Sequence, residues 1–417
     1  MNFSEFSCLD RGKYEYSNLE TNSESRKWYQ HDIDQLVYSN AFRKMQKKTQ
    51  LLSERDPRCR SRLIHTLEVT RIAKEISGSL GLDQDLTEAI ALGHDFGNTA
   101  FGRISNDFLN AKTNGLFHHE EISKLMIIDA TQKLIPRNND LRMKAVNLLE
   151  NTEIKYDSLN IDKFPFKIDV YKIANDYYYS CISPEVLDGV VKHATRQTAD
   201  TLEGQVVNYS DNIAYLSQDI DDLMSSRIIS DDDIDIFEAS TSSCQVKNMA
   251  IARGACSRSR SARIGVYIKY FVEHNMNLLE RDSFSSSHKS IILGRSIPVL
   301  ELSKDLECVI NLTWEFISKF YSNELISIAN QINKNKIESL WNILNDKNFA
   351  KDNQSYTDFI DKMNQPIYLN YKKEKGVKDS IWQAWTNAYF IAHLSFDEIQ
   401  TILNLYQSRD YTFELDM

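Results

Sequence analysis

Glycine and proline, the two residues that most often interrupt helices, are scarce in this chain. It contains 13 glycines and 6 prolines in 417 residues, and the glycine content is less than half the usual share of about 7%. Because both residues are unfavourable inside helices, the scarcity predicts an all-α fold. The length is sufficient for one large domain or two ordinary ones around a buried core.

The net charge, the N-terminal sequence and the cysteines indicate which binding partners and which cellular compartment to expect. A formal net charge of -10 argues against general nucleic-acid binding, which depends on neutralising phosphates, but leaves room for a local basic pocket. The start MNFSEFSCLD lacks the features of a signal peptide, and no apolar stretch reaches the ~18 residues of a membrane span. We therefore expect a cytoplasmic protein without membrane contact. Six scattered cysteines without a CxxC pair favour free thiols over a disulfide framework or a thiolate metal site.

The pattern of polar and apolar residues predicts three parts. Residues 1–25 are a polar N-terminal arm, 26–282 a helical core and 288–417 a C-terminal helical region, with the polar joint DSFSSS at 282–287 between the last two. The Ser-rich basic segment 242–263 is expected to be a loop, and residues 103–165 alternate loops and helices. Further helices are expected around 184–193, 202–224, 264–274, 310–320, 325–332 and 382–394.

A histidine stands at the start of the clearest helical stripe. His65 lies one turn before Val69, and the apolar residues then recur at steps of three and four: Val69, Ile72, Ala73, Ile76 and Leu80. Gly81 ends this helix, and Asp83 or Asp85 caps the next one. That second helix finishes in GHDFGN, where glycines flank the adjacent His94 and Asp95.

Imidazole and carboxylate groups together suit borderline divalent metals. His65 alone is more simply a buried core histidine, and an isolated His-Asp dipeptide occurs by chance. The spacing across two capped helices is more specific, and it needs a further anionic ligand. Asp211 is the candidate, since Asp211, Tyr215 and Asp219 fall at i, i+4 and i+8 on one helix face. The alternative is a solvated acidic face, which we prefer for Asp221 and Asp222.

Five strings in this order resemble the HD-domain dGTPase and related deoxynucleoside triphosphate triphosphohydrolases. They cover roughly residues 26–275 and comprise AFRKMQKKTQ (41–50), SRLIHTLEVTRIAKEI (61–76), EAIALGHDFGNTAFG (88–102), PEVLDGVVKH (184–193) and LEGQVVNYSDNIAYLSQDIDD (202–222). The segments 295–345 and YFIAHLSFDEI (389–399) look like more diverged helices of the same family. The resemblance implies an HD-domain helical core with additional C-terminal helices.

The resemblance also implies a set of site residues and a reaction. His65, His94, Asp95 and Asp211 match the ligands of a divalent metal ion (Mn²⁺, Mg²⁺, Zn²⁺ or Fe²⁺). Arg62 matches a phosphate-binding arginine, while Gln50, Tyr215 and Asp219 match contacts to the deoxyribose. The implied reaction is hydrolysis of a dNTP to the deoxynucleoside and intact triphosphate, by attack of water at the α-phosphorus. A divalent ion orients the phosphate and activates water, and arginine binds phosphate oxygens in pairs.

The chain departs from the family where relatives carry a proton-transfer pair. Arg103 and Asn106 occupy those positions; arginine stays protonated near neutrality, and an amide transfers no proton. Asn98 stands where relatives often have a histidine, although its amide can still bind a substrate oxygen. Three explanations compete: Asp107 and His119 take over the proton transfer, Arg103 stabilises phosphate charge, or the site binds nucleotide with little or no turnover.

These departures leave more than one function open. The first is a metal-dependent dNTP triphosphohydrolase; the alternative is a catalytically impaired nucleotide sensor or regulatory pseudo-enzyme, and a third is an HD phosphodiesterase or nucleotidase. Relatives form symmetric oligomers, so a homo-oligomer is expected, with an effector nucleotide or a regulatory protein as a further partner. The four basic residues of the loop 253–263 either contact a triphosphate or belong to a solvated connection: Arg253, Arg258, Arg260 and Arg263.

Overall fold

A computed structural model describes most of the chain. The described residues are 28–51, 60–131, 133–134, 146, 156–160, 167–173, 176–180, 182–195, 197–242, 249–281, 299–346, 348–349 and 353–408. The expected arm at 1–25 and the joint at 282–287 lie outside these residues.

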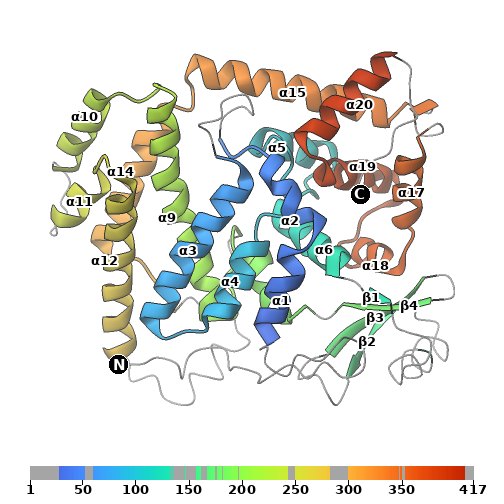
Figure 1. Cartoon of the computed structure of the whole chain (residues 1–417), viewed down its shortest axis with the longest axis horizontal. Helices are drawn as coiled ribbons and strands as arrows, with labels where there is room; N and C mark the ends of the chain where they lie inside the picture. Colours follow the sequence, from blue (N-terminus) through green and yellow to red (C-terminus); the bar gives the residue numbers. More distant parts are fainter. Residues whose placement is uncertain are drawn as a thin grey trace. The chain divides into compact units, whose positions relative to one another are not determined.

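The chain forms two compact units that interleave along the sequence. Of the described residues, the first unit contains Thr49–Asp95 and Glu185–Ile332; the second contains those up to Lys48, those in Phe96–Pro184 and those from Asn333. This division differs from the boundaries expected from composition, which stay a prediction. Helices dominate both units (Figure 1), and the predicted all-α class is confirmed.

Three helices that pack against one another form the centre of the first unit (Figure 1). They are α3 (Arg62–Leu80), α4 (Gln84–Gly93) and α9 (Leu202–Ser225). The apolar stripe predicted on α3, from Val69 to Leu80, is buried. Gly81 ends α3 in the left-handed conformation, with a φ of 69°, and the Asp83 side chain accepts from two backbone amides at the start of α4. Both predicted boundaries are therefore confirmed.

The remaining helices of the first unit surround this centre. The helix α12 packs against α3 and α9, and α14 packs against α9, α11 and α12. Their bounds, with those of the other helices in this unit, are α8 (Pro184–Lys192), α10 (Asp231–Ser242), α11 (Met249–Ala255), α12 (Arg260–Arg281) and α14 (Lys304–Ser318). The helix α15 (Glu324–Leu344) contains the boundary between the units.

The second unit combines helices with a small sheet. Its helices are α1 (Trp28–Val37), α2 (Asn40–Lys44), the 3₁₀ turn η2 (Met45–Lys47), α5 (Arg103–Lys112), α6 (His119–Thr131), α17 (Gln354–Lys362), α18 (Pro366–Glu374), α19 (Asp379–His393) and α20 (Phe396–Ser408). Both α1 and α2 pack on α6, while α19 contacts α5 and α17.

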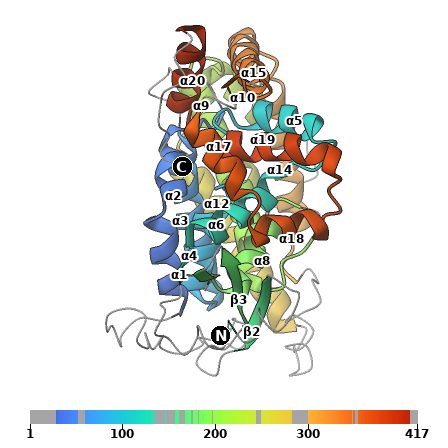
Figure 2. The same ribbon diagram turned by 90° about the vertical axis from the view of Figure 1, so that its right-hand side faces the viewer.

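The sheet was not predicted. Its strands are β1 (Lys133–Leu134), β2 (Tyr156–Asn160), β3 (Lys167–Ile173) and β4 (Asp176–Ser180), in the antiparallel order β1-β4-β3-β2. The helix α18 lies against β2 and β3 (Figure 2). Residues 103–165 therefore contain strands as well as the expected helices and loops.

Two further expectations need correction. The basic segment 242–263 is not one loop, because α11 begins at Met249 and α12 at Arg260. The helix that we expected at 264–274 is thus longer at both ends. Free thiols were expected throughout; Cys256 is a buried free thiol, whereas Cys308 is disulfide-bonded.

Candidate metal centre

Helix ends place the candidate metal ligands. The Ser61 side chain caps α3 by accepting from the Ile64 amide at 3.4 Å, which places His65 in the first turn. His94 is the C-cap residue of α4, in helical conformation, and Asp95 follows it. Asp211 lies within α9. Because α3, α4 and α9 pack on one another, the three segments meet inside the first unit.

The four side chains converge closely. The Nε2 atom of His65 lies 3.0 Å from Asp211 Oδ1 and 3.6 Å from Asp95 Oδ2. The Nε2 atom of His94 lies 3.3 Å from Asp95 Oδ2 and 3.8 Å from Asp211 Oδ1. His65, His94 and Asp95 are buried, and the Asp211 side chain is 26% exposed.

The two carboxylates strongly favour a positive charge among these four side chains. Burial opposes a charge on His94, but Asp95 and Asp211 outweigh it and raise the pKa of His94 to about 9. Burial would raise the pKa of Asp95, yet His94 and Arg62 hold this pKa well below its usual range. Burial likewise opposes ionisation of Asp211, and His65 lowers its pKa to about 2. A cation among the four side chains would supply such a charge.

The donor set fits a divalent metal. Ligand atoms bonded to one ion at ~2.0–2.2 Å lie roughly 3.0–3.5 Å apart, close to the separations of these imidazole and carboxylate atoms. The second ring nitrogen of each histidine faces an oxygen: His65 Nδ1 lies 2.7 Å from Gln218 Oε1, and His94 Nδ1 lies 2.6 Å from the Ala91 carbonyl. Each ring is thereby oriented with Nε2 toward the carboxylates.

Two more residues adjoin these ligands. The Arg62 guanidinium donates to Asp95 Oδ2 at 2.9 Å and to the Thr49 carbonyl at 3.5 Å, so the predicted phosphate-binding arginine lies beside a ligand. His193, which we did not predict, places its ring 4.9 Å from that of His94 and can form a metal-binding group with His94 and Asp95. His193 is the last residue of the string PEVLDGVVKH, so the family resemblance of this string could have identified it from the sequence.

Tyr215 and Asp219, two of the three predicted sugar contacts, also belong to the first unit and lie on the face of α9 that carries Asp211. Tyr321 joins them: its hydroxyl donates to Asp219 Oδ2 at 2.5 Å and lies 3.2 Å from the Tyr215 hydroxyl. Burial raises the pKa of Asp219 to about 6, although the two tyrosine hydroxyls act in the opposite direction. The Trp314 ring stacks on Tyr215 at 5.0 Å. Gln50 has a buried Oε1 that accepts no hydrogen bond from the described residues.

The other predicted site residues lie in the second unit. The Asn106 side chain accepts from Thr99 Oγ1 at 2.8 Å and donates to Asn98 Oδ1 at 2.9 Å. Both ends of its amide are thus engaged in holding the loop that follows Asp95. Arg103 and Asp107 are exposed on α5, and His119 begins α6 with its Nδ1 3.0 Å from Glu120 Oε2.

Acidic partners neutralise most of the basic segment. Arg260 Nη1 lies 2.6 Å from Glu68 Oε1, the buried Arg263 pairs with Asp221, and Arg258 Nε lies 2.9 Å from Asp231 Oδ1. Arg263 is only 1% exposed, which contradicts a wholly solvated connection. Asp221 pairs with Arg260 and Arg263, and Asp222 is buried and pairs with Arg60, so the solvated acidic face expected for both residues is wrong.

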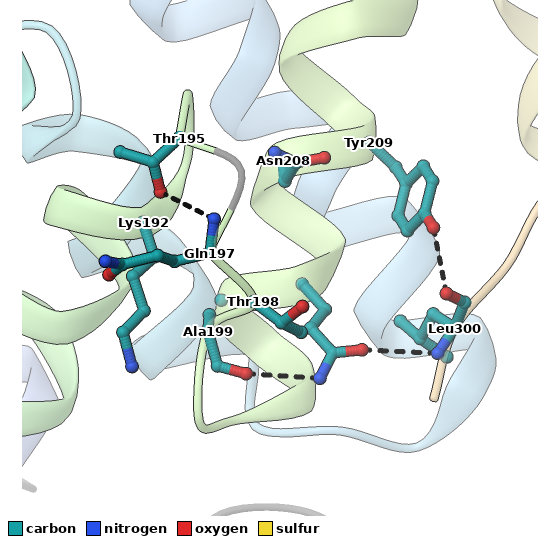
Figure 3. A pocket seen from close by; sticks show the side chains of 10 residues that line it. Lys192, Thr195, Gln197, Thr198, Ala199, Asn208, Tyr209 and Leu300 are labelled. Carbon is teal, nitrogen blue, oxygen red and sulfur yellow. Dashed lines mark hydrogen bonds between the residues drawn. The ribbon is translucent and has the colours of Figure 1, made fainter. Parts of the chain in front are cut away.

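A separate cavity of about 180 Å³ lies beside the first turns of α9 (Figure 3). Gln205 closes one side: its Nε2 donates to the Ala199 carbonyl at 3.1 Å, and its Oε1 accepts from the Leu300 amide at 3.2 Å. The charge of Lys192 is met by Asp188 and Asp200. These wall groups satisfy one another, and none of the predicted site residues lines the cavity.

Comparison with known proteins agrees with this geometry. Residues 62–216 match the family described as the HD domain, a range that contains all four candidate ligands. This part of the chain is therefore similar to the HD domain.

The sequence is, more particularly, similar to proteins named deoxyguanosinetriphosphate triphosphohydrolase-like. One from Caldanaerobacter subterraneus subsp. tengcongensis is 36% identical over 49% of this chain and 48% of the relative. One from Clostridium perfringens is 33% identical over 52% of each, and one from Desulfatibacillum aliphaticivorans is 34% identical over 49% of this chain and 50% of the relative. The chain spans about half the length of the curated relatives it matches. The resemblance drawn from the sequence is confirmed.

Within the described residues, no helix is both long and apolar enough to cross a membrane.

Proposed function

We propose that this chain is a metal-dependent dNTP triphosphohydrolase, which releases a deoxynucleoside and intact triphosphate. The close convergence of two imidazoles and two carboxylates in the segment that matches the HD domain carries this proposal. The names of the similar proteins support the choice of substrate. A divalent ion held by His65, His94, Asp95 and Asp211 would polarise the phosphate and activate water.

The other residues predicted from the sequence are assigned to binding and proton handling. Arg62, already oriented by Asp95, neutralises phosphate oxygens. Tyr215, Asp219 and Gln50 contact the deoxyribose, and Asn98 donates to a substrate oxygen. His119 and Asp107 handle protons, or Arg103 stabilises phosphate charge in their place.

The test is a product assay with each of the four dNTPs and Mn²⁺ or Mg²⁺. We expect tripolyphosphate and deoxynucleoside, with product formation abolished by Asp211→Asn. Gln400→Leu, an exposed change on α20, should leave the rate unchanged. The absence of both products with all four dNTPs at high enzyme concentration would overturn the proposal, and release of phosphate or a monophosphate would instead indicate a phosphodiesterase or nucleotidase.

A second candidate is a nucleotide sensor with little turnover. The observation that favours it is the Asn106 side chain, whose amide is engaged with Thr99 and Asn98 and cannot relay protons. A sensor should show a large thermal shift with dNTPs and no products. Turnover gained by Arg103→His combined with Asn106→Glu would identify an impaired site on a working scaffold.

We further propose a cytoplasmic homo-oligomer, regulated by an effector nucleotide or a protein partner. Sedimentation of the purified chain with and without dNTPs tests the assembly.

A further inference from the structure

Gln218 links a candidate metal ligand to a carboxylate. It is fully buried on α9, and its Oε1 lies 2.7 Å from His65 Nδ1. Its Nε2 donates to Glu68 Oε2. His65 and Glu68 lie three residues apart on α3, so this amide bridges two successive side chains on one face of the helix.

The surroundings of Glu68 fix which way this amide points. Arg260 Nη1 lies 2.6 Å and Arg60 Nε 3.2 Å from the Glu68 carboxylate. A carboxylate paired with two guanidinium groups only accepts hydrogen bonds, so the NH₂ end of Gln218 must face it. The oxygen end then faces His65.

This orientation determines the tautomer of His65. An amide oxygen accepts, so Nδ1 of His65 carries the proton and donates to Gln218. In the neutral ring, the lone pair is then on Nε2, the atom 3.0 Å from Asp211 Oδ1. A reversed amide would favour the opposite tautomer and put a proton where a metal ligand needs a lone pair.

We propose that Gln218 and Glu68 are positioning residues that fix the tautomer and ring orientation of His65 and thereby set the divalent-metal affinity of the site. The inference rests on the proposed role of His65 as a ligand and goes beyond the reaction. Partners of this kind, beyond the ligands themselves, typically change metal affinity by about 10–100-fold when they are removed.

Single and paired substitutions test whether Glu68 orients Gln218 and whether Gln218 in turn orients His65. Gln218→Leu removes the acceptor, and the Mn²⁺ dissociation constant should rise by about 10–100-fold. Glu68→Gln frees the amide to reverse and should also weaken binding, by less. Gln218→Glu alone sets two carboxylates against each other. Combined with Glu68→Gln, it again gives His65 an acceptor, held by a donating amide at position 68, and should restore affinity toward the native value.

Two readouts separate positioning from general stability. Free Mn²⁺ is measured by electron paramagnetic resonance during titration, and the His65 tautomer by long-range ¹H–¹⁵N correlation on histidine-labelled protein. The matched control for Gln218→Leu is Gln400→Leu, because Gln400 is exposed on α20 and its side chain donates to Asn404. Unfolding curves without metal report any loss of folding. Should Gln218→Leu fail to fold, Glu68→Gln, at a side chain 23% exposed, still tests the inference.

Either of two results would overturn the inference. One is an unchanged Mn²⁺ affinity in both single variants. The other is a native metal-free chain at neutral pH in which His65 carries its proton on Nε2 and none on Nδ1. Failure of the proposed function would give a different result: the Mn²⁺ affinities of the variants would change as predicted, while no dNTP is hydrolysed.

Discussion

Tyr321 is a residue of the candidate site that the sequence pattern does not reveal. The candidate metal ligands could be proposed from the sequence because their spacing follows helical periodicity and motif order. Tyr321, in contrast, meets Asp219 across 102 positions, and Gln218 meets His65 across 153. Such contacts depend on how helices pack, and neither residue stands out by type or spacing.

We expect Tyr321→Phe to weaken substrate binding. The change removes a donor to the buried Asp219, whose pKa of about 6 should rise further, so that less carboxylate is present near neutral pH. Loss of about 1 kcal/mol corresponds to roughly a fivefold increase in KM, with kcat little changed. Steady-state kinetics on the preferred dNTP measure it. Tyr406→Phe, which removes a comparable hydroxyl contact to Asp346, is the control, and an unchanged KM in Tyr321→Phe would refute the assignment.

His393 should make stability depend on pH. Burial lowers the pKa of His393 to about 3; nearby Asp129 opposes the shift, and Lys362 and Lys48 add to it. The folded-state pKa is below the unfolded value of about 6.5, so the stabilisation is present above pH ~6.5 and is lost as pH falls toward 3. Between pH 6.5 and 5 the loss is up to about 2 kcal/mol. Urea unfolding at pH 7 and 5 should show a smaller loss of the free energy of unfolding in His393→Gln than in the native chain. An equal loss in both proteins would contradict this prediction.

At the scale of elements, caps were easier to predict than strands. Gly81 and Asp83 mark helix ends by chemistry that is local to a few residues, so the sequence was sufficient. The strands β1–β4 depend on pairing between separate segments, and only β3 carries a short alternation, Ile168 and Val170 between polar neighbours. The early start of α12 depends on Arg260 and Arg263 meeting acids from other helices.

Gly97 sets how closely its loop approaches α6. A Cβ there would lie 2.1 Å from the His119 carbonyl oxygen and 2.4 Å from the Ser123 amide nitrogen, and backbone atoms cannot yield as side chains do. Gly97→Ala should therefore lower the free energy of unfolding by about 1–3 kcal/mol. The control is Gly265→Ala on α12, where an added Cβ meets nothing within 4 Å; it should be neutral or stabilising by up to about 1 kcal/mol. Equal effects of the two changes in urea unfolding would contradict the steric explanation.

At the scale of the whole molecule, the candidate ligands and the candidate proton-handling residues belong to different compact units. All four ligands lie in Thr49–Asp95 and Glu185–Ile332, whereas Arg103, Asp107 and His119 lie in Phe96–Pro184. Composition gave no sign of this division, because the chain passes between the units several times without a Pro- or Gly-rich linker. Metal binding should consequently act on one unit more than on the other.

Hydrogen exchange with and without Mn²⁺ tests this consequence. A ligand present at 100 times its dissociation constant stabilises the state that binds it by about 2.7 kcal/mol. We expect this to slow amide exchange in α3, α4 and α9, which hold the ligands, and to leave α17, α18 and α19 of the second unit nearly unchanged. EDTA should reverse the effect, and Asp211→Asn should abolish it. Equal slowing in both sets of helices would show that the units unfold together, whereas no slowing in α3, α4 and α9 would refute the metal centre itself.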